Sequence, residues 1–189
     1  AFRDGQEKMI DAITSGRDVL GIMPTGAGKS LCYQIPALMA GENGGITLVI
    51  SPLISLMKDQ VSALNQAGVH AAYLNSSLTS GQYYKALGYA REGRYPIIYV
   101  APERLLTPEF LDFAVHAKIA MVAVDEAHCV SQWGQDFRPG YLKIEEFLCT
   151  LPKRPVVSAF TATATAEVRD DIIDLLKLQD PVVTTTGFD

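Results

Sequence analysis

The chain has 189 residues, of which 48% are hydrophobic and 20% are charged, a composition typical of one globular domain with a sizeable core. No apolar run approaches the ~20 residues that a membrane-spanning helix needs, and the N-terminus lacks the apolar segment of a signal peptide, so we expect a soluble, non-secreted protein. The net charge of −5 argues against a broad basic surface for nucleic acid, and any such contact must be local.

Short apolar runs alternate along the chain with segments of helical periodicity. Strands are predicted at residues 18–23, 46–51, 71–75, 97–101, 119–125, 156–161 and 182–186. Helices are predicted close to the N-terminus and at residues 31–39, 54–67, 82–92 and 167–176, the last with an apolar stripe of Val168, Ile172, Leu175 and Leu176. This alternation is typical of an α/β fold with a mostly parallel sheet, and we expect residues 1–189 to form a single domain.

A glycine-rich loop follows the first predicted strand and opens the next helix. It reads Met23-Pro24-Thr25-Gly26-Ala27-Gly28-Lys29-Ser30, the pattern of a P-loop except at Met23, where the general pattern has glycine. In such loops the main-chain amides surround phosphate oxygens, the lysine reaches the β- and γ-phosphates, and the serine hydroxyl binds Mg²⁺. The sequence therefore predicts a nucleoside triphosphate site with Lys29 as a catalytic residue, lined by Thr25, Gly26, Ala27, Gly28 and Ser30.

The apolar run at 119–124 leads directly into two acidic residues, Asp125 and Glu126, with His128 close behind. Packing does not explain carboxylates at the tip of a buried strand, because unpaired buried charges are costly. We expect Asp125 to hold Mg²⁺ and Glu126 to act as a base or to position the attacking water. His128 alone could equally be a solvated side chain, but beside these acids we favour a functional role.

The tetrapeptide Asp-Glu-Ala-His after a P-loop is the signature of superfamily 2 helicases, and the neighbouring motifs resemble those of RecQ DNA helicases. Residues 2–6 resemble the end of the adenine-reading motif 0, which implies that Arg3 and Gln6 contact the base, and methionine at position 23 also matches that family. Residues 51–60, 101–104 and 160–164 resemble motifs Ia, Ib and III in the same order, so that the resemblance covers nearly the whole chain. It implies a RecA-like domain with helices on both faces of the sheet, and nucleic-acid or coupling roles for Pro102, Glu103, Arg104, Thr161 and Thr163.

Residues 131–139, Ser-Gln-Trp-Gly-Gln-Asp-Phe-Arg-Pro, resemble the aromatic-rich loop by which RecQ helicases couple DNA binding to ATP hydrolysis. Trp133 and Phe137 offer faces for base stacking, worth ~1–3 kcal/mol per base. A core role for both aromatics is the weaker alternative, because the Gly, Asp and Pro residues around them are typical of a loop. Gln135 stands where the family usually has histidine and cannot titrate, which leaves the strength of coupling open. The predicted coupling residues of this region are His128, Gln132, Trp133, Phe137 and Arg138.

Other kinds of site fit the sequence less well. Residues 78–82 loosely resemble the signature loop of ABC transporter ATPases, but they fit an ordinary helix start equally simply. No Asn-Lys-x-Asp element for reading guanine occurs, which favours an adenine nucleotide. The three cysteines lack the spacing of a zinc site and are expected to be reduced thiols.

The resemblance implies the ATP-binding lobe of a 3′–5′ ATP-dependent DNA helicase that uses ATP and Mg²⁺ and acts in DNA repair and recombination. The family's second lobe, with the arginine that stabilises the transferring phosphoryl group, has no matching segment here, so we expect a fragment that is nearly inactive alone. Its expected partners are single-stranded or duplex DNA and that second lobe, in a monomer located in bacterial cytoplasm or a eukaryotic nucleus. Two alternatives stay open: a nucleotide-binding module without turnover, and another nucleic-acid-dependent ATPase of superfamily 2.

Overall fold

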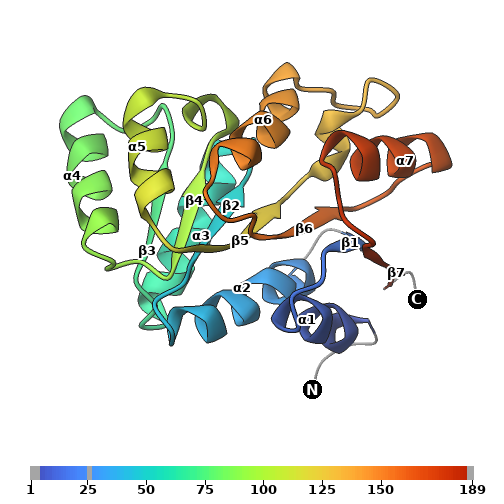
Figure 1. Cartoon of the computed structure of the whole chain (residues 1–189), viewed down its shortest axis with the longest axis horizontal. Helices are drawn as coiled ribbons and strands as arrows, with labels where there is room; N and C mark the ends of the chain where they lie inside the picture. Colours follow the sequence, from blue (N-terminus) through green and yellow to red (C-terminus); the bar gives the residue numbers. More distant parts are fainter. Residues whose placement is uncertain (1–4, 25–26, 187–189) are drawn as a thin grey trace.

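The computed structural model describes residues 5–24 and 27–186, without the side chain of Ala27 (Figure 1). Within these residues, seven strands form one sheet in the order β3-β4-β2-β5-β6-β1-β7, and every neighbouring pair is parallel. The strands are β1 (Val19–Ile22), β2 (Ile46–Ile50), β3 (Ala71–Leu74), β4 (Ile97–Val100), β5 (Ile119–Val124), β6 (Val156–Thr161) and β7 (Val182–Thr185). Parallel pairing requires a crossover between successive strands, and the helices supply it.

Helices cover both faces of the sheet (Figure 1). One layer holds α1 (Gln6–Thr14), α2 (Ala27–Gly41) and α3 (Ile54–Gln66), and the other holds α4 (Ser80–Arg91), α5 (Pro108–His116), α6 (Lys143–Thr150) and α7 (Ala166–Leu175). Three short 3₁₀ turns lie among the described residues: η1 (Pro102–Arg104), η2 (Ala127–Val130) and η3 (Pro139–Leu142). The fold is therefore a three-layer α/β/α domain, as the alternating pattern of the sequence predicts.

Each face of the sheet has its own hydrophobic core, because successive side chains of a strand point to opposite faces. Val19 of β1 packs with α1 to α3, whereas its neighbour Leu20 packs with α4 to α7. Aromatic rings pack against one another in both cores: Tyr33 packs on Phe160 on one side, and Phe110 packs on Phe147 on the other. The strands are buried on both faces, which explains their continuous apolar runs in the sequence.

Several helix boundaries differ from the sequence-based prediction. Helix α2 begins at Ala27 and ends at Gly41, so the prediction of 31–39 was too short at both ends. Helices α5 and α6 lie where no helix was predicted. Every predicted strand is present, with ends that differ by at most one residue.

The segment at 78–82 is the start of helix α4. The Thr79 hydroxyl accepts from the Gln82 amide at 3.1 Å, while the Gln82 side chain accepts from the Thr79 amide at 2.9 Å. This reciprocal pair is a capping box, which satisfies two amides that the first helical turn leaves without partners. The residues at 78–82 that resemble the ABC signature loop therefore form an ordinary helix start.

A buried acid joins three elements at the amino edge of the sheet. Asp18, just before β1, accepts from Arg154 at 2.7 Å and from the main-chain amides of Val157 and Gln179 at 3.0 and 2.7 Å. Its side chain is buried, and these donors satisfy the charge. Asp18 therefore fixes β1 beside β6. The carboxyl ends of these two strands and of β5 carry the site.

Candidate nucleotide and nucleic-acid site

Lys29 lies at the centre of a buried charge cluster at the carboxyl edge of the sheet. It stands in the first turn of α2, and its ammonium lies 3.0 Å from Asp125 Oδ1 and 3.3 Å from Glu126 Oε1, both just beyond β5. The exposed fractions of the side chains are 8% for Lys29, 7% for Asp125 and 15% for Glu126. The structure thus brings together the predicted phosphate-binding lysine and the two predicted acids.

The cluster shifts the pKa values of its members. Burial by itself lowers the pKa of the Lys29 ammonium, but Asp125 and Glu126 outweigh burial and hold that pKa above its ordinary value. Burial raises the pKa of the Asp125 carboxyl, and Lys29 opposes this shift. Lys29 is therefore charged at neutral pH, and its charge favours the ionised form of Asp125.

The start of α2 fits closely against α1. The side-chain amide of Gln6 donates to the carbonyl of Gly28 at 2.9 Å, and a Cβ added to Gly28 would lie 2.6 Å from the same Gln6 nitrogen. A side chain at position 28 would therefore displace the Gln6 amide from this hydrogen bond. Ser30 follows Lys29 in the first turn of α2. The other predicted positions, Arg3, Thr25 and Gly26, lie outside the described residues, and Ala27 opens α2.

These residues fit a triphosphate with Mg²⁺. A carboxylate and a hydroxyl are the oxygen ligands that Mg²⁺ prefers, and Asp125 and Ser30 offer them. A buried ammonium and the amino end of a helix suit phosphate oxygens. The donor set is therefore chemically consistent with the predicted ligand and metal.

Glu126 and His128 connect this cluster to the end of β6. Glu126 has a φ of 52°, in the left-handed region, so the chain turns sharply where β5 ends. His128 Nδ1 lies 3.6 Å from Glu126 Oε2 and 2.8 Å from the Thr161 hydroxyl, which in turn donates to the carbonyl of Thr163 at 3.1 Å. Polar contacts thus run without a gap from Lys29 to the segment after β6.

The predicted aromatic-rich loop, residues 131–139, lies beside that segment. Trp133 is 77% exposed and Gln132 is exposed, whereas Phe137 and Arg138 are half-buried. Arg138 pairs with Asp136 at 3.1 Å. A large indole in water has little packing to gain, so its exposure favours an external contact.

A cavity of about 360 Å³ separates the loop from the segment after β6. Its lining comprises His128, Trp133, Gly134, Gln135, residues 162–165 and Val168. Gln135 therefore lines this cavity with an exposed side chain. The cavity connects the charge cluster, through His128, with the exposed indole.

The residues predicted from motif Ib lie apart from the charge cluster. Pro102, Glu103 and Arg104 form η1 after β4, and Glu103 is exposed. The Arg104 guanidinium lies 4.5 Å from the ring centre of Tyr83 and donates to the carbonyl of Asn75 at 3.5 Å. These contacts hold Arg104 partly inward, and its nucleic-acid role stays a prediction.

Tyr141 is a site residue that no sequence motif indicated. Its hydroxyl donates to the carbonyl of Asp125 at 2.7 Å, and its ring is fully buried just after the aromatic-rich loop. Burial raises the pKa of Tyr141 well above its ordinary value, so the hydroxyl keeps its proton and donates. The contact spans 16 residues of sequence; the only local signal was a tyrosine shortly after Pro139.

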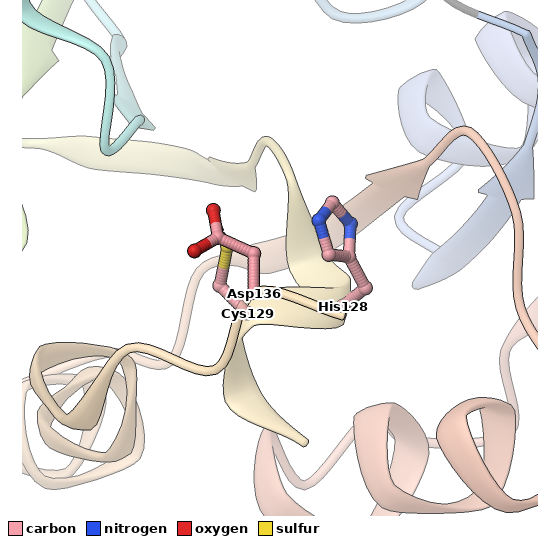
Figure 2. Close-up of side chains that lie close together, drawn as sticks. All are labelled: His128, Cys129 and Asp136. Carbon is pink, nitrogen blue, oxygen red and sulfur yellow. The ribbon is translucent and has the colours of Figure 1, made fainter. Parts of the chain in front are cut away.

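Three possible metal ligands, His128, Cys129 and Asp136, also meet at the base of the loop (Figure 2). One ligand atom from each lies within 4.8 Å of the others, and Figure 2 shows the Asp136 carboxylate beside the Cys129 sulfur, with the His128 ring to one side. Burial raises the pKa of the Cys129 thiol to about 12, and Asp136 already pairs with Arg138. The hydrogen bond of His128 with Thr161 and the ion pair of Asp136 with Arg138 already engage two of the three side chains, so we assign no metal to this group.

The chain is similar to known proteins over nearly its whole length. The sequence pattern of the DEAD/DEAH box helicase family matches residues 3–172. The "ATP-dependent DNA helicase RecQ" of Bacillus subtilis is 51% identical over 188 residues, and that of Pasteurella multocida is 49% identical over 189. These alignments cover 99% and 100% of this chain but only 31% and 29% of the relatives, so the chain spans about a third of their length.

Solved structures support the fold independently. The Hef helicase domain of Pyrococcus furiosus superposes with a TM-score of 0.71 at 18% identity, covering 97% of this chain and 38% of that one. At this identity the likeness concerns the RecA-like fold alone. None of the helices in the described part of the chain has the length and apolarity to cross a membrane. From the matched pattern, the chain belongs to the DEAD/DEAH box helicase family, and it is similar to RecQ helicases over nearly its whole length.

Proposed function

We propose that this chain is the ATP-binding lobe of a RecQ-type DNA helicase. The observation that carries the proposal is the contact of the Lys29 ammonium with both Asp125 and Glu126, at 3.0 and 3.3 Å, beside a Gly28 carbonyl that accepts from the Gln6 amide. Relatives at 51% and 49% identity are named ATP-dependent DNA helicases, which supports DNA as the nucleic acid. The 3′–5′ direction and the role in repair and recombination rest on the resemblance to RecQ enzymes.

Each residue of the cluster has a distinct proposed task. Lys29 pairs with the phosphates, and Gln6, fixed against Gly28, reads the adenine. Asp125 and Ser30 would hold Mg²⁺, which would neutralise phosphate charge. Glu126 orients the attacking water and accepts its proton at a carboxylate oxygen, and the nearby His128 keeps that carboxylate in place.

The route from nucleotide to nucleic acid runs through the end of β6. His128 touches Glu126 on one side and Thr161 on the other, and both His128 and Trp133 line the cavity beside residues 162–165. A base stacked on Trp133 would therefore lie beside the segment after β6, which His128 links to Glu126. We propose that this contact makes ATP hydrolysis depend on single-stranded DNA, with Phe137 and Arg138 helping to hold the strand.

We further propose that efficient hydrolysis needs a second lobe. An arginine that stabilises the transferring phosphoryl group is worth ~10³–10⁵ in rate, and RecQ resemblance places it in that lobe. In the part of the chain that the structure describes, the ion pairs of Asp125 and Glu126 are with Lys29 and His128. The whole protein would be a monomer acting on DNA, in the nucleoid if bacterial.

The test compares residues 1–189 with the longer protein that includes its next domain, by steady-state ATPase assay with and without single-stranded DNA. We expect turnover near background for the chain of residues 1–189 and DNA-stimulated turnover for the longer protein. Robust stimulated turnover by residues 1–189 would contradict the need for a second lobe. Glu126→Gln in the longer protein should bind ATP and hydrolyse none; turnover in that variant would assign the water to another acid.

A further inference from the structure

Ser131 is a fully buried hydroxyl at the start of the aromatic-rich loop. Its Oγ donates to Asp171 Oδ2 at 2.7 Å and accepts from the main-chain amide of Trp133 at 3.1 Å. Asp171 lies on α7, 40 residues further along the chain. The position of the loop is therefore fixed from outside the loop.

The direction of these two hydrogen bonds follows from the charge of Asp171. An ionised carboxylate can only accept, so the hydroxyl hydrogen of Ser131 must point to it. A lone pair of the same oxygen then faces the Trp133 amide. Hydrogen bonds to a carboxylate are short and strong, and this one holds the serine in a single orientation.

The rest of the loop is held by its backbone. Gly134 N donates to Ser131 O at 3.1 Å, and Arg138 N donates to Cys129 O at 2.9 Å. A Cβ on Gly134 would lie 2.9 Å from the His128 carbonyl, so the backbone passes close to η2. The indole of Trp133, by contrast, is 77% exposed. Its place in space thus comes from the backbone at 131–134, and not from packing of the ring.

Helix α7 also follows directly on the segment after β6. Its N-cap Thr165 accepts from Val168 N at 3.3 Å, and both residues line the cavity opposite Trp133. Asp171, one turn further along, reaches the loop from the same helix. One rigid element therefore borders the cavity and holds the loop that closes it.

We propose that Asp171 is a positioning residue for Trp133, acting through the Ser131 hydroxyl. The carboxylate fixes Ser131, Ser131 fixes the amide of Trp133, and the backbone that carries the exposed indole is thereby held at the edge of the cavity. This role in DNA binding rests on the proposed function. If Trp133 stacks on a DNA base, Asp171 reduces the conformational entropy that DNA binding would otherwise cost.

The chain contains a single tryptophan, so its fluorescence reports on this loop alone. The test measures time-resolved fluorescence anisotropy of Trp133 in the wild-type chain without DNA. In Asp171→Ala we expect the amplitude of the nanosecond component of the anisotropy decay to grow by roughly half or more. Local loop motion occurs on that timescale. Ser131→Ala should give the same change, and the double variant should add little to either single one.

Two variants separate positioning from general loss of structure. Asp170→Ala, an exposed acid on the same helix, should leave the anisotropy decay at wild-type values. Asp171→Asn keeps an accepting oxygen of the same shape and should restore most of the wild-type decay. If Asp171→Ala unfolds, Ser131→Ala supplies the comparison with wild type, because it removes the same hydrogen bond from the other side.

The outcomes are distinct. An unchanged decay in folded Asp171→Ala, or equal decays in Asp170→Ala and Asp171→Ala, would overturn the positioning role. A faster decay in Asp171→Ala with rescue by Asp171→Asn supports it. Affinity for a single-stranded oligonucleotide, measured separately, should fall several-fold in Asp171→Ala. Altered decay with unaltered DNA affinity would leave the positioning role intact and contradict the proposed contact of Trp133 with DNA.

Discussion

Lys29 and Trp133 carry the two halves of the proposed function, and the fold holds them in opposite ways. Lys29 is 8% exposed and lies between two carboxylates that define its position. Trp133 is 77% exposed and is placed by hydrogen bonds of its backbone. A buried site is thus fixed by mutual charge pairing, whereas an exposed site depends on anchors at its ends. The two regions should respond differently to substitution.

The largest expected effect on stability is in the buried region. Lys29→Ala leaves Asp125 buried without its cation, which typically costs about 3–5 kcal/mol in the free energy of unfolding. Chemical denaturation at pH 8 would measure this loss. A loss below ~1 kcal/mol would show that the ion pair of Lys29 with Asp125 does little to stabilise the fold.

The same variant should show a characteristic pH dependence. Burial raises the pKa of Asp125, and removing Lys29 takes away the main opposing effect and leaves the hydrogen bond from the Glu126 amide. A group with a folded pKa above its unfolded value contributes stability at low pH and loses it as the pH rises through the folded pKa. The deficit of Lys29→Ala relative to wild type should therefore shrink between pH 8 and pH 5. A deficit independent of pH would assign it to lost packing.

A smaller effect is expected where the two regions meet. Tyr141→Phe removes the hydroxyl that donates to the Asp125 carbonyl and should cost about 1–3 kcal/mol, as expected for a buried acceptor that loses its donor. Tyr73→Phe is the matched control, because in the described part of the chain the Tyr73 hydroxyl has no hydrogen bond. Equal stabilities of the two variants would remove Tyr141 from the site.

The exposed region should behave in the reverse way. Trp133→Ala should change the free energy of unfolding by less than ~0.5 kcal/mol, because the ring buries little surface. It should weaken binding of a single-stranded oligonucleotide by roughly 5- to 100-fold, the loss of one stacked base. Thermal unfolding and fluorescence anisotropy of a labelled oligonucleotide test the two statements. A large fall in melting temperature would assign Trp133 to the core instead.

The smallest effect concerns thiol reactivity. Burial raises the pKa of Cys32 to about 11 and that of Cys129 to about 12, whereas Cys149 is exposed. At pH 7 a maleimide should therefore label Cys149 first, even though Glu145 raises the pKa of that thiol. Mass spectrometry should find one label on the folded chain and three after denaturation. Rapid labelling of Cys129 would show that the base of the loop opens.

The sequence predicted most of the sheet and the centre of the site, for physical reasons. The strands are continuous apolar runs because they are buried on both faces, and the end of β5 is marked by two acids that packing does not require. Lys29, Asp125 and Glu126 could be placed together because parallel strands bring their carboxyl ends to one edge.

The missed features are contacts between distant side chains. Tyr141 meets Asp125 across 16 residues, and Ser131 meets Asp171 across 40, and neither pair has a local pattern. Helix α5 was missed although Phe110 and Phe113 are fully or almost fully buried, because an apolar run of that length also fits a strand or an irregular connection. Such features depend on tertiary packing, which a single sequence does not display.

The most direct test of the nucleotide site is calorimetric titration of the chain with ATP in the presence of Mg²⁺. The wild-type chain should bind one ATP, and Lys29→Ala, measured at a pH and temperature where circular dichroism shows it folded, should bind at least ~10-fold more weakly because it lacks the buried cation. Lys58→Ala, an exposed lysine of α3, should bind as wild type does. Equal ATP affinity in wild type and Lys29→Ala would contradict the assignment of this cluster as the nucleotide site.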